Sequence, residues 1–274
     1  GKGSRGAKTR DADFVEHMFV ASAHNYLMLF TETGRCYWLR VYEIPEASKT
    51  ASGRVIQNLI SIPPDEKVKA YINIKNLTDK EFLENHYLIF CTKNGIIKKT
   101  TIESYSRIRS NGINAINIHE GDQLLNVKLT NGNNEIVIAT RGGRAIRFHE
   151  QKVRPMGRNA SGVKGVTLDD KISDAVIGLI SVDPSNKEES ILVVSSNGYG
   201  KRSELEDYRV TNRGGKGVKT MNISSKTGLL TAIMVVRDDE DLMITDQNGI
   251  VIRMAIAEIR IMGRATQGVR VIRL

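Results

Sequence analysis

The sequence predicts an all-β protein resembling a β-propeller, with repeats of about 50 residues that each hold about four strands. Three observations support this prediction. A glycine loop recurs along the chain, a strand-turn-strand pattern precedes each loop at a near-constant distance, and no long helical stripe occurs. A β-sandwich would also explain strands and turns, but it would not require one motif at one phase five times. The repeats therefore favour a propeller-like array of five complete units and the remnant of a sixth.

The recurring loop is clearest in TNRGGKGVK, residues 211–219. Aligned on the last glycine of each loop, successive copies lie 59, 50, 55 and 51 residues apart. These loop glycines are Gly53, Gly112, Gly162, Gly217 and Gly268. Counting back 50 residues from the first of them reaches Gly3 in GKGSRG, so we expect the chain to open on the tail of a sixth loop.

A hairpin signal runs in phase with the loops, because a glycine turn between two apolar runs precedes each of them. The hairpin glycines that we assign are Gly34, Gly95, Gly142, Gly198 and Gly249. They precede their loop glycines by 19, 17, 20, 19 and 19 residues, which indicates one supersecondary unit used five times. Three of the turns contain Asn-Gly, which predicts a two-residue primed turn with φ above zero.

The same order of elements is expected in every repeat. A hairpin such as YLMLF with RCYWLRV comes first, a short polar link leads to the glycine loop, and a strand such as INAINI or VKGVTL follows the loop. A polar connection then feeds a further strand such as KAYINI or LNVKLT. Within one domain over 1–274, the predicted boundaries are 1–13 for the remnant and 14–64, 65–122, 123–172, 173–226 and 227–274 for the repeats.

The composition favours a polyanionic partner, and nucleic acid is the first candidate. The chain has 40 Lys and Arg against 31 Asp and Glu, a net charge of +9, and a sequence pI near 9.5. Cys36 and Cys91 belong to no CxxC pair, so they indicate core thiols and a reducing cytoplasm. No apolar run approaches the length of a membrane span and the basic N-terminus has no apolar core, so we expect a soluble protein.

Cations recur at two equivalent places in each repeat, which in a ring would form a basic belt able to hold duplex DNA without base-specific reading. Those just after the turns are Arg35, Arg40, Lys98, Lys99, Arg144, Arg147, Lys201, Arg202 and Arg253. Those in or beside the loops are Lys49, Arg54, Arg107, Arg109, Arg154, Arg158, Lys164, Arg213, Lys216, Lys219, Arg260, Arg264 and Arg270, with Lys2 and Arg5 near the N-terminus. The loop glycines would let backbone N–H groups approach phosphates. Tyr199 is expected to be an exposed turn residue rather than a base-stacking one.

Catalysis and metal binding find little support in the sequence. GKGSRG matches a dinucleotide-binding pattern, but no strand precedes it and no helix follows. The five histidines show no metal-ligand spacing, and the acidic pairs fall at turns where carboxylates are normally solvated.

With these residues in view, the whole chain resembles the C-terminal domain of the DNA gyrase A protein, the β-pinwheel. The specific cues are DFVEHMFVASAHNYLMLF, GRCYWLRVYEIPEAS, NGYGKRSELEDY, MGRNASGVKGV and MGRATQGVRVIRL. The family carries a box of sequence Gln-Arg-Arg-Gly-Gly-Lys-Gly in its first blade. Gly1, Lys2 and Gly3 match its last three positions, and the run Arg213, Gly214, Gly215, Lys216 and Gly217 keeps its Arg-Gly-Gly-Lys-Gly portion in a later blade.

The resemblance implies a non-catalytic module without a cofactor of its own, which wraps duplex DNA and presents a segment to the strand-passage core. The family's full enzyme uses ATP and Mg on other domains, so the implied partners are DNA, the gyrase A N-terminal domain and the gyrase B protein. It also implies a bacterial, nucleoid-associated protein. The missing front of the box departs from the family pattern.

Two alternatives stay open. The C-terminal domain of the topoisomerase IV A protein has a similar blade but a degenerate box, and five well-kept repeats fit gyrase better. A propeller scaffold for protein partners is of a different class, and its binding would be insensitive to salt.

Overall fold

The computed structural model describes residues 5–6, 25–40, 60–245 and 248–271. The chain divides into two compact units. Unit 1 comprises residues 1–7, 133–152 and 164–274, and unit 2 comprises residues 8–132 and 153–163. Four-stranded sheets dominate both units, which confirms the all-β, repeated architecture. The single domain over 1–274 and its five repeat boundaries stay predictions.

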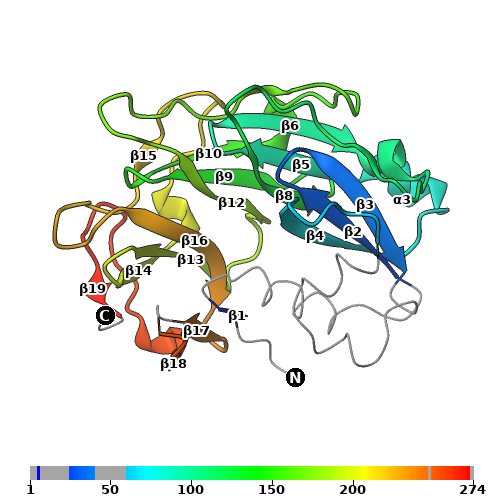
Figure 1. Ribbon diagram of the computed structural model, residues 1–274. Helices are drawn as coiled ribbons and strands as arrows, with labels where there is room; N and C mark the ends of the chain where they lie inside the picture. Colours follow the sequence, from blue (N-terminus) through cyan, green and yellow to red (C-terminus); the bar gives the residue numbers. More distant parts are fainter. Residues whose placement is uncertain (1–4, 7–24, 41–59, 246–247, 272–274) are drawn as a thin grey trace. The chain divides into compact units, whose positions relative to one another are not determined.

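Unit 2 is built on two four-stranded sheets (Figure 1). The first has the order β4 (Val68–Ile74), β2 (Tyr26–Thr31), β3 (Arg35–Arg40), β7 (Ile113–Asn114). The second has the order β8 (Leu124–Thr130), β5 (Tyr87–Thr92), β6 (Ile96–Thr101), β11 (Val163–Lys164). Helix α3 (Lys80–Asn85) precedes β5, and its N-cap Asp79 accepts a hydrogen bond from the Phe82 N–H. A 3-10 turn, η3 (Ile102–Tyr105), follows β6.

Unit 1 repeats this design (Figure 1). One sheet has the order β12 (Val176–Val182), β9 (Glu135–Thr140), β10 (Arg144–His149), β15 (Val218–Lys219). Another has the order β16 (Leu230–Arg237), β13 (Glu189–Ser195), β14 (Tyr199–Ser203), β19 (Val269–Arg270). A three-stranded sheet has the order β1 (Arg5–Gly6), β17 (Asp241–Thr245), β18 (Val251–Ala255). The 3-10 turns are η4 (Glu150–Lys152), η5 (Leu205–Asp207) and η6 (Ile256–Glu258).

The fourth strand of each four-stranded sheet comes from the loop of the following repeat. β7 pairs antiparallel with β3, β15 with β10, and β19 with β14, and each of these donated strands has only two residues. The sequence predicted a longer strand after each loop, such as INAINI. The strand is shorter because the chain then turns toward the next loop, where the Asn117 N–H donates to the Ala160 carbonyl.

The hairpin turns differ in type from the prediction. In the described turns the glycine N–H donates to the carbonyl three residues earlier, as from Gly143 to Thr140 and from Gly34 to Thr31. Only glycines have positive φ among the described residues, so these are three-residue turns with a left-handed glycine rather than primed two-residue turns. The hairpin glycine of the third repeat is therefore Gly143, with φ 87°, and the assignment of Gly142 was wrong.

In each four-stranded sheet the first strand of the hairpin (β2, β5, β9 or β13) is an inner strand buried on both faces. This explains unbroken apolar runs such as YLMLF at 26–30. In unit 2, Phe30 and Phe90 meet edge-to-face with ring centroids 5.4 Å apart, and Tyr105 packs against both. Cys36 and Cys91 are buried free thiols in this region, so the interpretation as core thiols is confirmed.

Candidate nucleic-acid interface

Five cations that the sequence assigned to DNA binding lie in the interior. These residues are at most 8% exposed: Lys98, Lys99, Arg147, Lys201 and Arg202. A phosphate cannot reach groups so enclosed, so the prediction is wrong for these five. For all of them except Lys99, the intramolecular partners described below explain why the sequence places cations there.

One of these positions, four residues after the hairpin glycine, supplies a long hydrogen-bond donor to the next repeat. Arg147 Nη1 donates to the Tyr208 carbonyl at 2.9 Å, and Arg202 Nε donates to the Ile259 carbonyl at 2.7 Å. In the first repeat the indole Nε1 of Trp38 makes the same bond to the Tyr105 carbonyl at 3.0 Å. In these three repeats the bond to the next repeat requires reach and an N–H group, and Trp38 shows that it does not require a charge.

Arg147 also forms a buried ion pair with Glu135 across the β9–β10 hairpin. Its Nη2 donates to Glu135 Oε1 at 3.0 Å, and Nε bonds the other carboxylate oxygen. In the next repeat Arg202 instead bonds Ser190 and the more exposed Asp238. These arginines hold the ends of their own hairpins against the following repeat.

The residue three after the hairpin glycine is a buried lysine in two repeats. Lys98 Nζ donates to the carbonyls of Ala115 and Arg158, both at 2.6 Å. Lys201 Nζ contacts the carbonyls of Gly263 and Thr266 at 2.9 Å and that of Arg264. Burial lowers the pKa of Lys98 to about 7 and that of Lys201 to about 8. Both lysines tie a hairpin to the next loop from inside.

Replacing Lys98 with Met is expected to remove a pH dependence of stability. Burial lowers the pKa of Lys98 to about 7, whereas an unfolded lysine titrates near 10.4, so between these values the unfolded state binds more protons. Because of this difference in bound protons, the lysine makes the free energy of unfolding rise with pH over that range. Urea unfolding at pH of about 7 and about 9.5 should show the wild type gaining stability relative to Lys98→Met. A difference that does not change with pH would contradict this.

The loop glycines pack against the preceding hairpin. A Cβ on Gly112 would lie 2.8 Å from the Cys36 carbonyl oxygen, and one on Gly268 would lie 2.7 Å from that of Gly200. In the box-like loop, the Gly214 N–H donates to the Gly165 carbonyl at 2.8 Å. The idea that this N–H faces a phosphate is therefore wrong, because the neighbouring loop already accepts its hydrogen bond.

The exposed cations gather in and beside the loops. Among the predicted residues they are Arg40, Arg107, Arg109, Arg144, Arg154, Lys164, Lys216, Lys219, Arg253, Arg260 and Arg270. Arg253 pairs with Asp241, and Arg40 lies over the Tyr26 ring. Within residues 25–40, 60–245 and 248–271, none of the other nine forms an ion pair with an acid. These nine are called the loop cations here.

Some loop cations face each other across the donated strands. Arg144 lies directly opposite Lys219 in the β10–β15 pair, and both side chains are exposed. Like charges at directly opposite positions repel each other, so binding of a polyanion would reduce this unfavourable electrostatic energy. In the next sheet Arg270 lies opposite Tyr199, 5.5 Å from the ring centroid. Tyr199 is only 5% exposed, which corrects the expectation of an exposed turn residue.

Lys226 is a basic residue that the sequence analysis missed. It is exposed, and its Nζ lies 5.8 Å from the Tyr199 ring that Arg270 also contacts. It lies in a connection between repeats, outside both repeating basic positions, so the periodicity gave no signal for it.

Four further predicted cations are half-buried and donate to loop carbonyls: Arg35, Arg158, Arg213 and Arg264. Six predicted positions lie outside the described residues or side chains: Gly1, Lys2, Gly3, Arg5, Lys49 and Arg54. For Arg5 only the strand placement is described.

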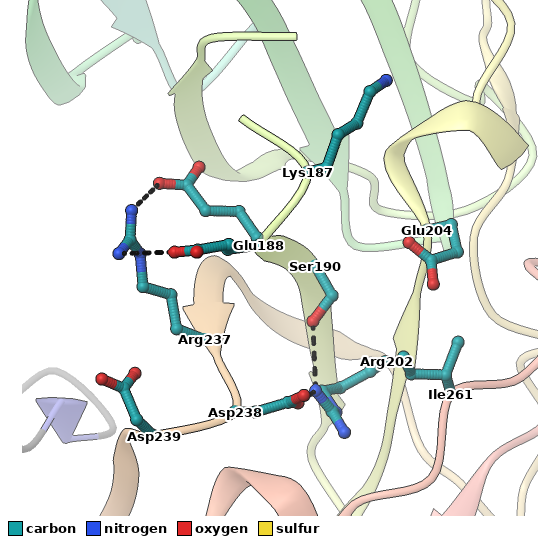
Figure 2. A pocket seen from close by; sticks show the side chains of 10 residues that line it. Lys187, Glu188, Ser190, Arg202, Glu204, Arg237, Asp238, Asp239 and Ile261 are labelled. Carbon is teal, nitrogen blue, oxygen red and sulfur yellow. Dashed lines mark hydrogen bonds and ion pairs between the residues drawn. The ribbon is translucent and has the colours of Figure 1, made fainter. Parts of the chain in front are cut away.

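A pocket of about 400 Å³ in unit 1 has a different character (Figure 2). Figure 2 shows Arg202 with Ser190 and Asp238 on one side and Arg237 with Glu188 on the other. Its lining holds more acids than bases, so it does not suit a phosphate backbone. No acid, histidine and cysteine cluster suited to a metal occurs in the described part of the chain. Nor does any described helix have the length and apolar character needed to cross a membrane.

Comparison with known proteins identifies relatives along the chain. The family model described as DNA gyrase C-terminal domain, beta-propeller, matches residues 25–70, 86–131, 134–183, 189–237 and 240–274. The DNA gyrase A proteins of Staphylococcus epidermidis and of Staphylococcus aureus are each 43% identical over 274 residues, covering 100% of this chain and 30% of the relative.

Solved structures show the same fold. The C-terminal domain of a DNA topoisomerase IV is 28% identical with a TM-score of 0.80, covering 92% of this chain and 76% of that one. A DNA gyrase A C-terminal domain is 23% identical with a TM-score of 0.76, covering 93% of this chain and 80% of that one.

Proposed function

Because the chain belongs to the DNA gyrase C-terminal domain family, we propose that it binds duplex DNA, without sequence preference, through its loop cations. The observation that carries the proposal is the difference in ion pairing between the loop cations and other basic residues. The loop cations have no acidic partner among the described residues, whereas cations such as Arg147, Lys187 and Arg237 are paired with acids. Unpaired cations repeated on successive loops suit the evenly spaced charges of a phosphate backbone.

The role in a larger enzyme rests on the relatives alone. The chain spans 30% of the length of the curated gyrase A relatives that it matches. We propose that it is the non-catalytic, cofactor-free wrapping part of such a protein, and that it directs a DNA segment to strand-passage machinery supplied by the other gyrase domains. The gyrase relatives match the whole chain at 43% identity and the topoisomerase IV domain is 28% identical, which favours gyrase.

Removing two loop cations tests the binding surface. Lys216→Gln with Lys219→Gln should make the plot of log affinity against log salt less steep by about 2, since each neutralised phosphate contributes about −0.9. At about 0.1 M salt the affinity should fall about eightfold for each lysine, by the same relation. Fluorescence anisotropy with a labelled duplex over a salt series measures both quantities.

The matched control removes the same charge elsewhere in unit 1. Lys187→Gln with Arg237→Gln alters the acid-rich pocket of Figure 2, so it should leave the slope unchanged. Equal losses in the two double variants would show that net charge alone, and not the loops, governs binding.

A further inference from the structure

An arginine stands four residues before the loop glycine in three consecutive loops, at Arg158, Arg213 and Arg264. Each guanidinium donates Nη1 to a carbonyl of the preceding donated strand. The acceptors are the carbonyls of Asn114 at 2.8 Å, Lys164 at 3.0 Å and Lys219 at 2.6 Å, in that order. All three acceptors lie two residues after a loop glycine, so one contact is repeated from loop to loop.

In the last two repeats the same guanidinium has a second anchor. Arg213 Nε donates to the Lys152 carbonyl at 3.2 Å, and Arg264 Nε donates to the Asp207 carbonyl at 3.0 Å. Lys152 ends η4 and Asp207 ends η5. Each arginine therefore joins the preceding repeat's 3-10 turn to its donated strand, and the rigid fork of the guanidinium makes two such bonds possible.

The residues held in this way carry loop cations. Arg213 fixes the backbone of Lys164, and Arg264 fixes that of Lys219, while both lysine side chains are exposed. A backbone bond supports the same spacing, because the Thr167 N–H donates to the Gly215 carbonyl at 2.9 Å. The distance between exposed lysines of successive loops thus depends on the arginines.

We propose that Arg213 and Arg264 are positioning residues, which set the spacing of Lys164 and Lys219 along the bound duplex. This rests on the proposed DNA binding and adds a role that charge alone does not explain. Both arginines are half-buried and already donate to two carbonyls each. Lysine keeps the charge but cannot span both acceptors.

A double-mutant cycle tests the proposal, with Arg213→Lys and Arg264→Lys as one change and Lys164→Gln and Lys219→Gln as the other. The arginine change should lower affinity for a duplex of about 100 base pairs roughly tenfold at an unchanged salt slope. Once the two lysines are removed, the same arginine change should cost less than about twofold, because nothing is left to position. A purely structural role would give additive losses.

The control makes the same arginine-to-lysine change four positions earlier in the chain. Arg209 stands eight residues before its loop glycine, is exposed, lies outside the loop cations, and makes no side-chain hydrogen bond or ion pair among the described residues. Arg209→Lys should leave the affinity unchanged, while circular dichroism and thermal unfolding confirm that this variant and the arginine pair fold.

Additive losses in the cycle, or an equal loss in the control, would overturn the positioning role while the proposed binding stands. A wild-type chain that fails to bind duplex at low salt would overturn both. An arginine variant that does not fold would also overturn it, since the loops would then serve the fold and not the register of the lysines.

Discussion

Raising the salt concentration from about 50 to about 200 mM should lower the affinity for duplex DNA by about four orders of magnitude. If about eight phosphates are neutralised, the slope of log affinity against log salt is near −7, and a fourfold change in salt has this effect. The exposed loop cations are numerous enough to supply these contacts. Binding isotherms on one duplex across the salt series measure the slope.

Two unrelated duplex sequences of equal length provide the control, and they should give the same slope and similar affinities. The proposed contacts are cations on loops, and no described helix is placed to read base edges. A slope shallower than about −2, or strong sequence preference, would contradict the proposed binding. If the chain instead binds a protein partner with an affinity that does not change with salt, the alternative of a propeller scaffold for protein partners would be favoured.

Gly217→Ala should destabilise unit 1 by about 3 kcal/mol or more, because a side chain is excluded at this position. Its φ is 75°, and a Cβ would lie well under 3.0 Å from the Ala145 carbonyl oxygen and carbon. Both obstacles are backbone atoms of β10, so the β10–β15 pairing must open to make room. Guanidinium chloride unfolding followed by circular dichroism measures the loss.

Gly215→Ala is the matched control two residues away in the same loop. Its Cβ would meet only the Ile146 Cδ1 atom at 3.8 Å, an ordinary van der Waals contact. This variant should change the free energy of unfolding by less than about 0.5 kcal/mol. Equal stabilities of the two variants would mean that the loop glycine is dispensable.

The repeat architecture could be predicted from the sequence because glycine has a steric role that no other residue fills. The alignment on Gly112, Gly162, Gly217 and Gly268 selected residues with positive φ that pack under the preceding hairpin. Replacing Gly142 with Gly143 as a hairpin glycine brings its spacing to 19 residues, matching three of the other repeats. Adjacent glycines are equivalent in sequence, and only the backbone conformation separates them.

The burial of Lys98, Arg147 and Lys201 could not be predicted in the same way. Each has a backbone carbonyl acceptor in the following repeat, namely that of Arg158, Tyr208 and Gly263 in turn, and backbone carbonyls have no sequence signature. Arg147 and Tyr208, for instance, are 61 residues apart. Strand patterns place a charged residue on a face, but they do not show whether a neighbouring segment covers that face.

The donated strands also govern the order in which the molecule can form during synthesis. Arg144 and the Gly217 carbonyl that it bonds are 73 residues apart, and Arg35 and the Asn111 carbonyl are 76 apart. A hairpin that has left the ribosome therefore keeps one open edge until the whole of the next repeat has been translated. At about 5–20 residues per second this wait lasts several seconds for each blade. During this time the nascent chain exposes an unpaired strand edge. The elongation rate through each repeat therefore determines how long that edge can pair with a neighbouring chain.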